Sequence, residues 1–228
     1  MVDRCLLYYI TDRAAFGADE PTRRSRLLEK ISEAARAGVD SIQLREKDLS
    51  TRDLESLARE AVRVIHESGQ TTGRPLSSLL INSRTDVALA TGADGLHLRS
   101  DDVSPEEVRR IWSSCGAGAH ARENTALHPL IAVSCHTLQE VSEAAHQKAS
   151  FAVFAPVFEK KGALDSTPTG LVALAEACKA DIPVLALGGI TLANGRACLD
   201  AGAAGIAAIR LFQENDIAEI VSSLRDQR

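Results

Sequence analysis

Eight short apolar runs alternate with eight amphipathic stretches along this chain of 228 residues. A short apolar run between turn residues is typical of a buried strand, and apolar residues three and four positions apart are typical of a helix. The expected strands are 6–11, 41–45, 78–82, 95–98, 130–134, 151–157, 184–188 and 205–210. The expected helices are 23–37, 51–68, 84–91, 104–112, 138–147, 171–180, 192–201 and 214–224.

Eight strand-then-helix units without a linker between them favour a (β/α)8 TIM barrel, built as a single α/β domain over residues 1–228. An open, doubly wound sheet is the alternative. Helix-start signals support the reading: Ser50 is a good N-cap, and Ser104 with Glu107 and Thr137 with Glu140 form the capping-box pattern. In either fold, ligands bind at the carboxyl ends of the strands.

The composition narrows the classes of function. The net charge is −5 and the pI about 5.7, and no basic tract suggests nucleic acid, so an anion would have to be attracted by a local site. The five cysteines are widely spaced without a CxxC pair, which indicates free thiols in a reducing compartment. The polar N-terminus does not resemble a signal peptide, and no apolar run is long enough to cross a membrane, so we expect a cytoplasmic protein.

Long polar side chains alternate where the second expected strand ends, at Gln43, Arg45 and Lys47. A period of two points all three to the same side of the sheet. Two cations and an amide that converge at a strand end suit phosphate or diphosphate, since arginine supplies a planar donor fork and lysine a mobile charge. The alternative is a solvated charged turn.

A glycine pair, Gly188-Gly189, follows the seventh strand, and Ile209-Arg210 ends the eighth. Loops after these two strands often bind phosphate in such barrels, because glycine lets backbone N–H groups approach a ligand. We expect a phosphate site there. A Gly189→Val change should then weaken phosphate binding and leave the fold intact.

Further polar residues lie near other strand ends. Asn82 ends the third strand and could hydrogen-bond a heterocycle, and His97 lies inside the fourth. Asp101 and Asp102 follow that strand and either help to bind Mg²⁺ or cap the next helix, two readings that the sequence leaves open.

Ser134, Cys135 and His136 end the fifth strand. His136 is a candidate general acid/base, the alternative being a hydrogen bond at the start of the next helix. Cys135 is interpreted as a small residue at the edge of the core. The polar stretch 158–170 after the sixth strand is either a lid or phosphate clamp or a plain connection.

Several motifs together resemble the thiamine phosphate synthase/TenI family, from about Leu7 to Phe212. The motifs are QLREK at 43–47, INSRTDVA at 81–88, GADGLHL at 92–98, VSCHT at 133–137, LGGI at 187–190 and AGAAGIA at 201–207. The resemblance implies the same (β/α)8 barrel, small phosphorylated heterocycles as ligands and a homodimer. It implies Mg²⁺ only together with a diphosphate ligand, and no other cofactor.

The family has two branches. The synthase branch joins hydroxymethylpyrimidine diphosphate to thiazole phosphate, and the TenI branch moves a proton on a thiazole carboxylate phosphate. The resemblance assigns the pyrimidine diphosphate to Gln43, Arg45, Lys47 and Asn82, its phosphates to Ser134 and Lys160, the thiazole phosphate to Gly188-Gly189, weak Mg²⁺ binding to Asp102, and proton transfer in the TenI branch to His136.

This chain departs from the synthase pattern in three places. Ser83 stands where synthases carry an Mg²⁺-binding aspartate, the Thr-x-Thr-Lys stretch is missing after the sixth strand, and Arg210 replaces a serine. The first two departures remove groups that handle Mg²⁺ and diphosphate and spare those for a proton shift. They favour a TenI-like thiazole phosphate tautomerase that uses His136. A thiamine phosphate synthase and an inactive thiazole or thiamine phosphate-binding protein are the alternatives.

Overall fold

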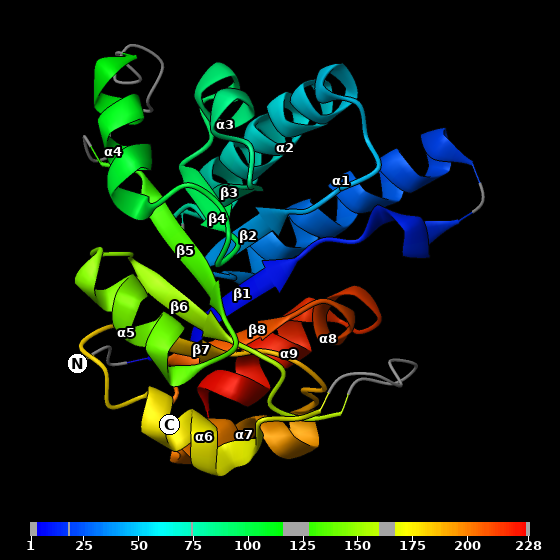
Figure 1. The fold of residues 1–228 in the computed structure, drawn as a ribbon. Coiled ribbons are helices and arrows are strands. Elements are labelled where there is room, and N and C mark those ends of the chain that lie inside the picture. The colour runs from blue at the N-terminus through cyan, green and yellow to red at the C-terminus, as the bar shows by residue number, and fades with distance from the viewer. Residues whose placement is uncertain (1–3, 18, 74, 116–127, 160–166, 227–228) are drawn as a thin grey trace.

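The chain forms a closed barrel of eight parallel strands in chain order, with β1 paired to β8 (Figure 1). The computed structural model describes residues 4–17, 19–73, 75–115, 128–159 and 167–226. The strands are β1 (Leu6–Ile10), β2 (Ser41–Leu44), β3 (Ser78–Asn82), β4 (Gly95–Leu98), β5 (Leu130–Cys135), β6 (Phe151–Phe154), β7 (Val184–Ala186) and β8 (Gly205–Ala208). The predicted barrel is therefore confirmed, and the open sheet is wrong.

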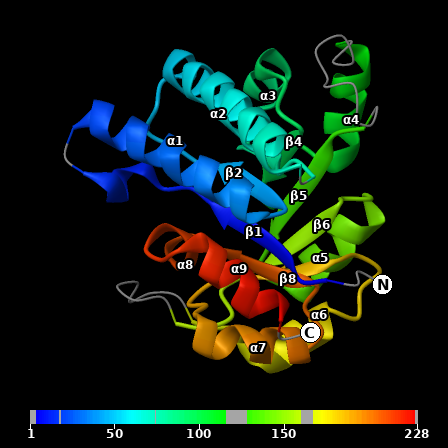
Figure 2. The same cartoon turned by 180° about the vertical axis from the view of Figure 1, so that it is seen from behind.

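Helices follow the strands and surround the barrel. They are η1 (Arg13–Phe16), α1 (Glu20–Ala37), α2 (Thr51–Thr72), α3 (Thr85–Thr91), α4 (Pro105–Ser114), α5 (Leu138–His146), α6 (Gly170–Ala177), α7 (Leu192–Asp200), α8 (Arg210–Gln213) and α9 (Ile217–Arg225). The view from behind shows α9 near the start of β1, and α9 contacts both α1 and α7, so it closes the helical layer (Figure 2). None of the described helices is long and apolar enough to cross a membrane.

The strands divide the core into two apolar layers. Tyr8, Leu80, Ala132, Val153 and Leu185 belong to a cluster that fills the inside of the barrel. The alternate residues of the same strands pack outward against the helices. This period of two means that a polar residue at an inward position near the end of a strand faces the barrel mouth.

Sequence signals for helix starts are confirmed by the caps. The Ser50 hydroxyl accepts a hydrogen bond from the Asp53 N–H at 3.2 Å. Both predicted capping boxes are present, Ser104 with Glu107 and Thr137 with Glu140. These bonds satisfy N–H groups that have no partner within the helix, and so they fix where α2, α4 and α5 begin.

Some predicted boundaries are wrong for local reasons. Helix α1 begins at Glu20 because Asp19 caps it, and α9 begins only at Ile217 because Asp216 is its N-cap. The eighth strand was expected to reach Arg210 but ends at Ala208, since Ile209 already has helical φ and ψ. Arg210 therefore opens α8, a short helix that the sequence analysis missed. The stretches 116–127 and 160–166 lie outside the described residues.

Candidate functional site

A cavity of about 1060 Å³ opens at the carboxyl ends of the strands. Residues that follow or end β2, β3, β4, β5, β7 and β8 line it. Its wall includes most of the predicted site residues: Gln43, Arg45, Lys47, Asn82, Ser134, His136, Gly188, Gly189, Ile209 and Arg210. Asp102 lies outside this wall, and Lys160 lies outside the described residues.

The turn after β2 presents positive charge to the cavity. Gln43 is buried within β2, the strand ends at Leu44, and Arg45 and Lys47 follow. Among the described residues, neither cation has an ion-pair partner. The nearby Arg45 charge is the main cause that lowers the pKa of Lys47, and burial and Arg99 add to it. Two cations that repel one another and have no counter-charge within the described structure form a site suited to a multivalent anion.

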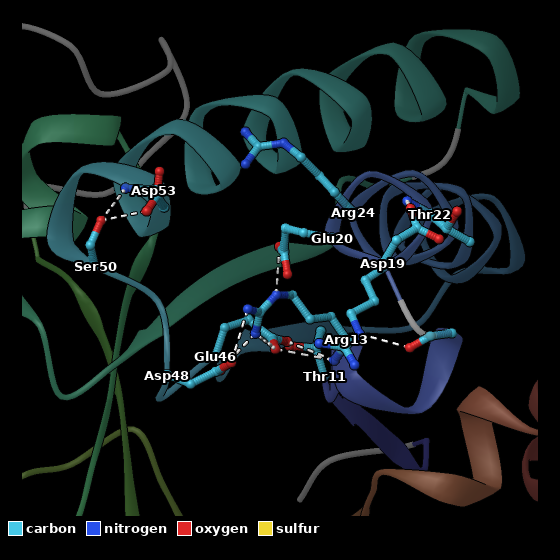
Figure 3. Close-up of polar contacts among 12 residues, drawn as sticks. Thr11, Arg13, Asp19, Glu20, Thr22, Arg24, Glu46, Asp48, Ser50 and Asp53 are labelled. Carbon is cyan, nitrogen blue, oxygen red and sulfur yellow. Dashed lines mark hydrogen bonds and ion pairs between the residues drawn. The ribbon is translucent and has the colours of Figure 1, made fainter.

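An ion cluster around the buried pair of Arg13 and Glu46 holds this turn from the other side (Figure 3). Glu46, which lies between Arg45 and Lys47, is only 6% exposed and accepts hydrogen bonds from the Thr11 hydroxyl at 2.5 Å and the Arg13 guanidinium at 3.3 Å. Arg13 also donates to Asp48 at 2.6 Å and to Glu20 at 2.9 Å. Alternate residues of the turn thus point in opposite directions, two into this cluster and two toward the cavity.

A chain of hydrogen bonds connects the ends of β2 and β3. The Gln43 Nε2 donates to the Asn82 Oδ1 at 2.8 Å, and the Asn82 Nδ2 donates to the Ser83 hydroxyl at 3.2 Å. The buried Oε1 of Gln43 accepts no hydrogen bond within the described structure. Because a buried acceptor without a partner is costly, this oxygen is a candidate to receive an N–H group from a ligand.

Asp102 accepts hydrogen bonds from Ser83 and Arg99 and does not cap the next helix. Its Oδ2 accepts from the Ser83 hydroxyl at 2.5 Å and from the Arg99 N–H at 2.8 Å. Ser104 caps α4, so the prediction that the aspartates cap this helix is wrong, and Asp101 pairs with Arg99. No group of three or more acidic, histidine or cysteine side chains in the described part of the chain is placed so that it could hold a metal ion by itself. Asp102 therefore fits Mg²⁺ only as one ligand beside phosphate oxygens and water.

His136 lies in the cavity wall, as predicted. Its Nδ1 is 2.8 Å from the Ala155 carbonyl oxygen, and because a carbonyl only accepts, Nδ1 is the protonated nitrogen. The Nε2 of the neutral ring then carries the lone pair. The His136 backbone N–H donates to Glu140 at 2.5 Å, so the residue also takes part in the start of α5. Burial raises the pKa of the Cys135 thiol to about 12, in keeping with its interpretation as a core residue.

Packing alone requires the glycine pair, whatever ligand binds there. Gly188 and Gly189 have φ values of 103° and 64°. A Cβ at Gly189 would lie 2.3 Å from the Glu159 carbonyl oxygen, and one at Gly188 would lie 2.8 Å from the Pro156 Cα. The expectation that Gly189→Val leaves the fold intact is therefore wrong, because valine would displace the segment after β6.

His97 and Tyr8, which contact one another inside the barrel, carry no motif that predicts a role for them. His97 lies in β4 with its side chain in the barrel, 3% exposed. The Tyr8 hydroxyl is 3.0 Å from the His97 Nδ1, and the His97 Nε2 is 2.7 Å from the Ser134 hydroxyl. Strand alternation could have placed Tyr8 and His97 inside the barrel, but no motif shows that they meet.

These features define a (β/α)8 barrel with a polar, cationic cavity at the strand ends that is lined by a glycine turn after β7, the arrangement of barrels that bind phosphorylated ligands. Residues 7–212 match the family model described as thiamine monophosphate synthase. The chain therefore belongs to the thiamine monophosphate synthase/TenI family of thiamine-biosynthesis enzymes.

Named relatives agree with this assignment. The chain is 35% identical to the thiamine-phosphate synthase of Roseiflexus castenholzii over 90% of this chain and 80% of that protein. It is 34% identical to the thiamine-phosphate synthase of Methanoculleus marisnigri over 97% of this chain and 94% of that protein. The structure of the thiamine phosphate pyrophosphorylase from Pyrococcus furiosus is similar with a TM-score of 0.75 and 27% identity, covering 99% of this chain and 96% of that one.

Proposed function

We propose that this chain is a thiamine phosphate synthase, which joins hydroxymethylpyrimidine diphosphate to thiazole phosphate. The observation that carries the proposal is the presence of two separate groups suited to anions in one cavity. One is the pair of cations after β2, Arg45 and Lys47, and the other is the glycine turn after β7 with the start of α8. Two anion-binding groups suit a reaction of two phosphorylated substrates, and the named relatives support the same reading.

In this proposal each wall of the cavity has a task. Arg45 and Lys47 bind the diphosphate, and Gln43 and Asn82 orient the pyrimidine ring, the free Oε1 of Gln43 accepting from a ring amine. Gly188, Gly189, Ile209 and Arg210 bind the thiazole phosphate. The Ser134 hydroxyl donates a hydrogen bond to the phosphates. By resemblance to the family, the charge of Lys160 also binds these phosphates.

In this reaction the protein chiefly positions the two substrates and stabilises the charge on the leaving group. The bond between the methylene carbon of the pyrimidine and the diphosphate oxygen breaks, and diphosphate leaves with the electron pair. The lone pair of the thiazole nitrogen forms the new carbon–nitrogen bond. Arg45 and Lys47 stabilise the negative charge that grows on the leaving group, and two anchored substrates place the reacting atoms close together.

Asp102 would hold an Mg²⁺ ion that arrives with the diphosphate. Bound there, the ion would neutralise charge on the leaving group. Ser83 occupies the position of a second carboxylate and instead donates a hydrogen bond to Asp102. We therefore expect Mg²⁺ to bind weakly unless diphosphate is present.

A TenI-like tautomerase is the second candidate, and His136 is the observation in its favour. Its Nδ1 is held by the Ala155 carbonyl, which leaves Nε2 to take a proton from a thiazole ring and return it. Ser83 favours this reading as well, because a proton shift needs no metal-bound diphosphate. Arg45 and Lys47, which have no ion-pair partner among the described residues, have no evident task in that reaction.

The test compares both reactions with the same purified protein. Pyrimidine diphosphate, thiazole phosphate and Mg²⁺ should yield thiamine phosphate, which chromatography resolves from the substrates. A second reaction contains the thiazole carboxylate phosphate alone. Isomerisation there without any thiamine phosphate in the first reaction would replace the synthase by the tautomerase, and no turnover in either would favour an inactive binding protein.

A further inference from the structure

A line of three polar side chains crosses the inside of the barrel from β1 to the cavity. The Tyr8 hydroxyl lies 3.0 Å from the His97 Nδ1, and the His97 Nε2 lies 2.7 Å from the Ser134 Oγ. Tyr8 is fully buried, His97 is 3% exposed, and the His97 and Ser134 side chains border the cavity. The function described above uses only Ser134, so Tyr8 and His97 are buried polar groups that still lack a role.

The direction of both hydrogen bonds follows from the need of each buried group for a partner. Among the described residues, the His97 Nδ1 is the sole hydrogen-bond partner of the Tyr8 hydroxyl. If Nδ1 carried the proton, the Tyr8 proton would be buried without an acceptor, which is unfavourable. Tyr8 therefore donates to Nδ1, and the neutral ring carries its proton on Nε2.

The Nε2 proton in turn determines what Ser134 can do. Because Nε2 donates to the Ser134 oxygen, the Ser134 proton cannot point back at the histidine and is left for the cavity. We propose that Tyr8 and His97 are positioning residues that hold the Ser134 hydroxyl as a hydrogen-bond donor to a diphosphate oxygen of the substrate. The proposal rests on the diphosphate ligand of the proposed function.

The surroundings of His97 keep the ring in this neutral form. Burial, with a smaller effect of the Arg45 charge, lowers the pKa of His97 to about 3. A protonated ring would donate from both nitrogens and would force the Tyr8 hydroxyl to turn away. The Tyr8 and His97 rings also stack with their centroids 5.7 Å apart, which limits rotation of the imidazole.

A double-mutant cycle tests whether Tyr8 acts through Ser134. Inorganic diphosphate is the probe, titrated calorimetrically in Mg²⁺-containing buffer. Ser134→Ala should weaken its binding by about 10- to 100-fold, the usual worth of a hydrogen bond to a charged group. Tyr8→Phe should weaken it by roughly 3- to 10-fold, and the double variant should bind no more weakly than Ser134→Ala alone. Losses that multiply, or a Tyr8→Phe variant that binds as the wild type does, would overturn the proposal.

Tyr9→Phe is the matched control. Tyr9 is the next residue of β1, is equally buried, and donates to Gln213 at 3.2 Å on the other side of the strand. Removal of the Tyr9 hydroxyl should leave diphosphate binding unchanged. A loss of affinity equal to that of Tyr8→Phe would mean that any buried hydroxyl of β1 matters, and would overturn the specific role of Tyr8.

Nitrogen NMR of the wild type gives an independent reading of the His97 tautomer. A proton on Nε2 is expected, and a proton on Nδ1 would contradict the proposal without any substitution. Both measurements are independent of turnover. If the synthase assay fails while the coupling and the tautomer hold, the positioning role stands and only the proposed reaction falls.

Discussion

In the proposed site, Lys47 is the residue whose ionisation would report most directly on a bound anion. In the free protein the Arg45 charge, burial and Arg99 all lower its pKa, and no acid pairs with it within the described structure. A bound anion would raise the pKa of Lys47 again, because it favours the charged amine. Binding of an anion and protonation of Lys47 should therefore be linked.

This linkage predicts a pH dependence of diphosphate affinity. Affinity should be full below the lowered pKa of Lys47 and should fall as pH rises through it, by up to about tenfold per pH unit. Lys47→Arg keeps its charge at these pH values and should remove the alkaline fall. Calorimetric titrations across the alkaline range check this, and an unchanged fall in Lys47→Arg would assign the effect to another group.

Ser83 lets the proposed Mg²⁺ site beside Asp102 be tested. Ser83→Asp would place a second carboxylate beside Asp102, in place of a hydroxyl that is 2.5 Å from its Oδ2. We expect Mg²⁺ affinity at fixed diphosphate to rise on the order of tenfold, since hard cations prefer carboxylate oxygens. Ser83→Ala is the control, because it removes the same hydroxyl without adding charge, and it should produce no gain. Equal affinities in all three proteins would place the metal elsewhere.

At the scale of elements, the turn from β2 to α2 is built from two opposed sets of side chains. Arg13, in η1, binds Glu46 with both side chains almost fully buried, at 4% and 2% exposure. Removal of one partner of a buried ion pair leaves an uncompensated charge, whereas loss of an exposed pair costs little. The rigidity of the turn that carries Arg45 and Lys47 therefore depends on Arg13.

Arg13→Met should lower the free energy of unfolding by about 3–5 kcal/mol. Arg59→Ala breaks an exposed pair with Glu55 on α2 and should cost about 0.3–0.5 kcal/mol. Urea denaturation measures both values. Adding Glu46→Gln to Arg13→Met should recover part of the loss, since the buried charge is then gone. A loss for Arg13→Met as small as that for Arg59→Ala would show that the cluster does not hold the turn.

The turn between β7 and α7 offers a second comparison. Gly189 and Gly73 both have a φ of 64°, so alanine is strained equally at either position. At Gly73 the added Cβ would meet nothing within 4 Å, whereas at Gly189 it would lie 2.3 Å from a carbonyl oxygen. Gly189→Ala should therefore be less stable than Gly73→Ala by about 1–3 kcal/mol, the usual cost of overpacking. Equal unfolding free energies would mean that the segment after β6 yields without cost.

At the scale of the whole molecule, periodicity was sufficient to predict the barrel. Strand ends then placed residues as distant in sequence as Gln43, Ser134 and Gly188 around one cavity, because all parallel strands present their carboxyl ends to the same rim. Contacts between side chains of different strands and turns could not be predicted from the sequence. Nothing in a pattern shows that Tyr8 meets His97 or that Ser83 binds Asp102, since these pairs depend on rotamers and on strand register.

The branch of the family also depends on the whole cavity more than on any one substitution. Ser83 and the missing threonines suggested the tautomerase, whereas the cavity has two groups suited to anions, and the named relatives support the synthase. Oxygens of the substrate can replace a lost metal ligand of the protein. A comparison of protein motifs does not reveal this replacement.

Phosphorus NMR of one reaction tests this account most directly. The purified protein is mixed with pyrimidine diphosphate, thiazole phosphate and Mg²⁺, and the spectrum follows every phosphorus atom. If the protein is a synthase, the signals of the pyrimidine diphosphate ester decrease, and free inorganic diphosphate and thiamine phosphate appear in equal amounts. A diphosphate ester that persists unchanged, with a protein that binds both substrates, would contradict it.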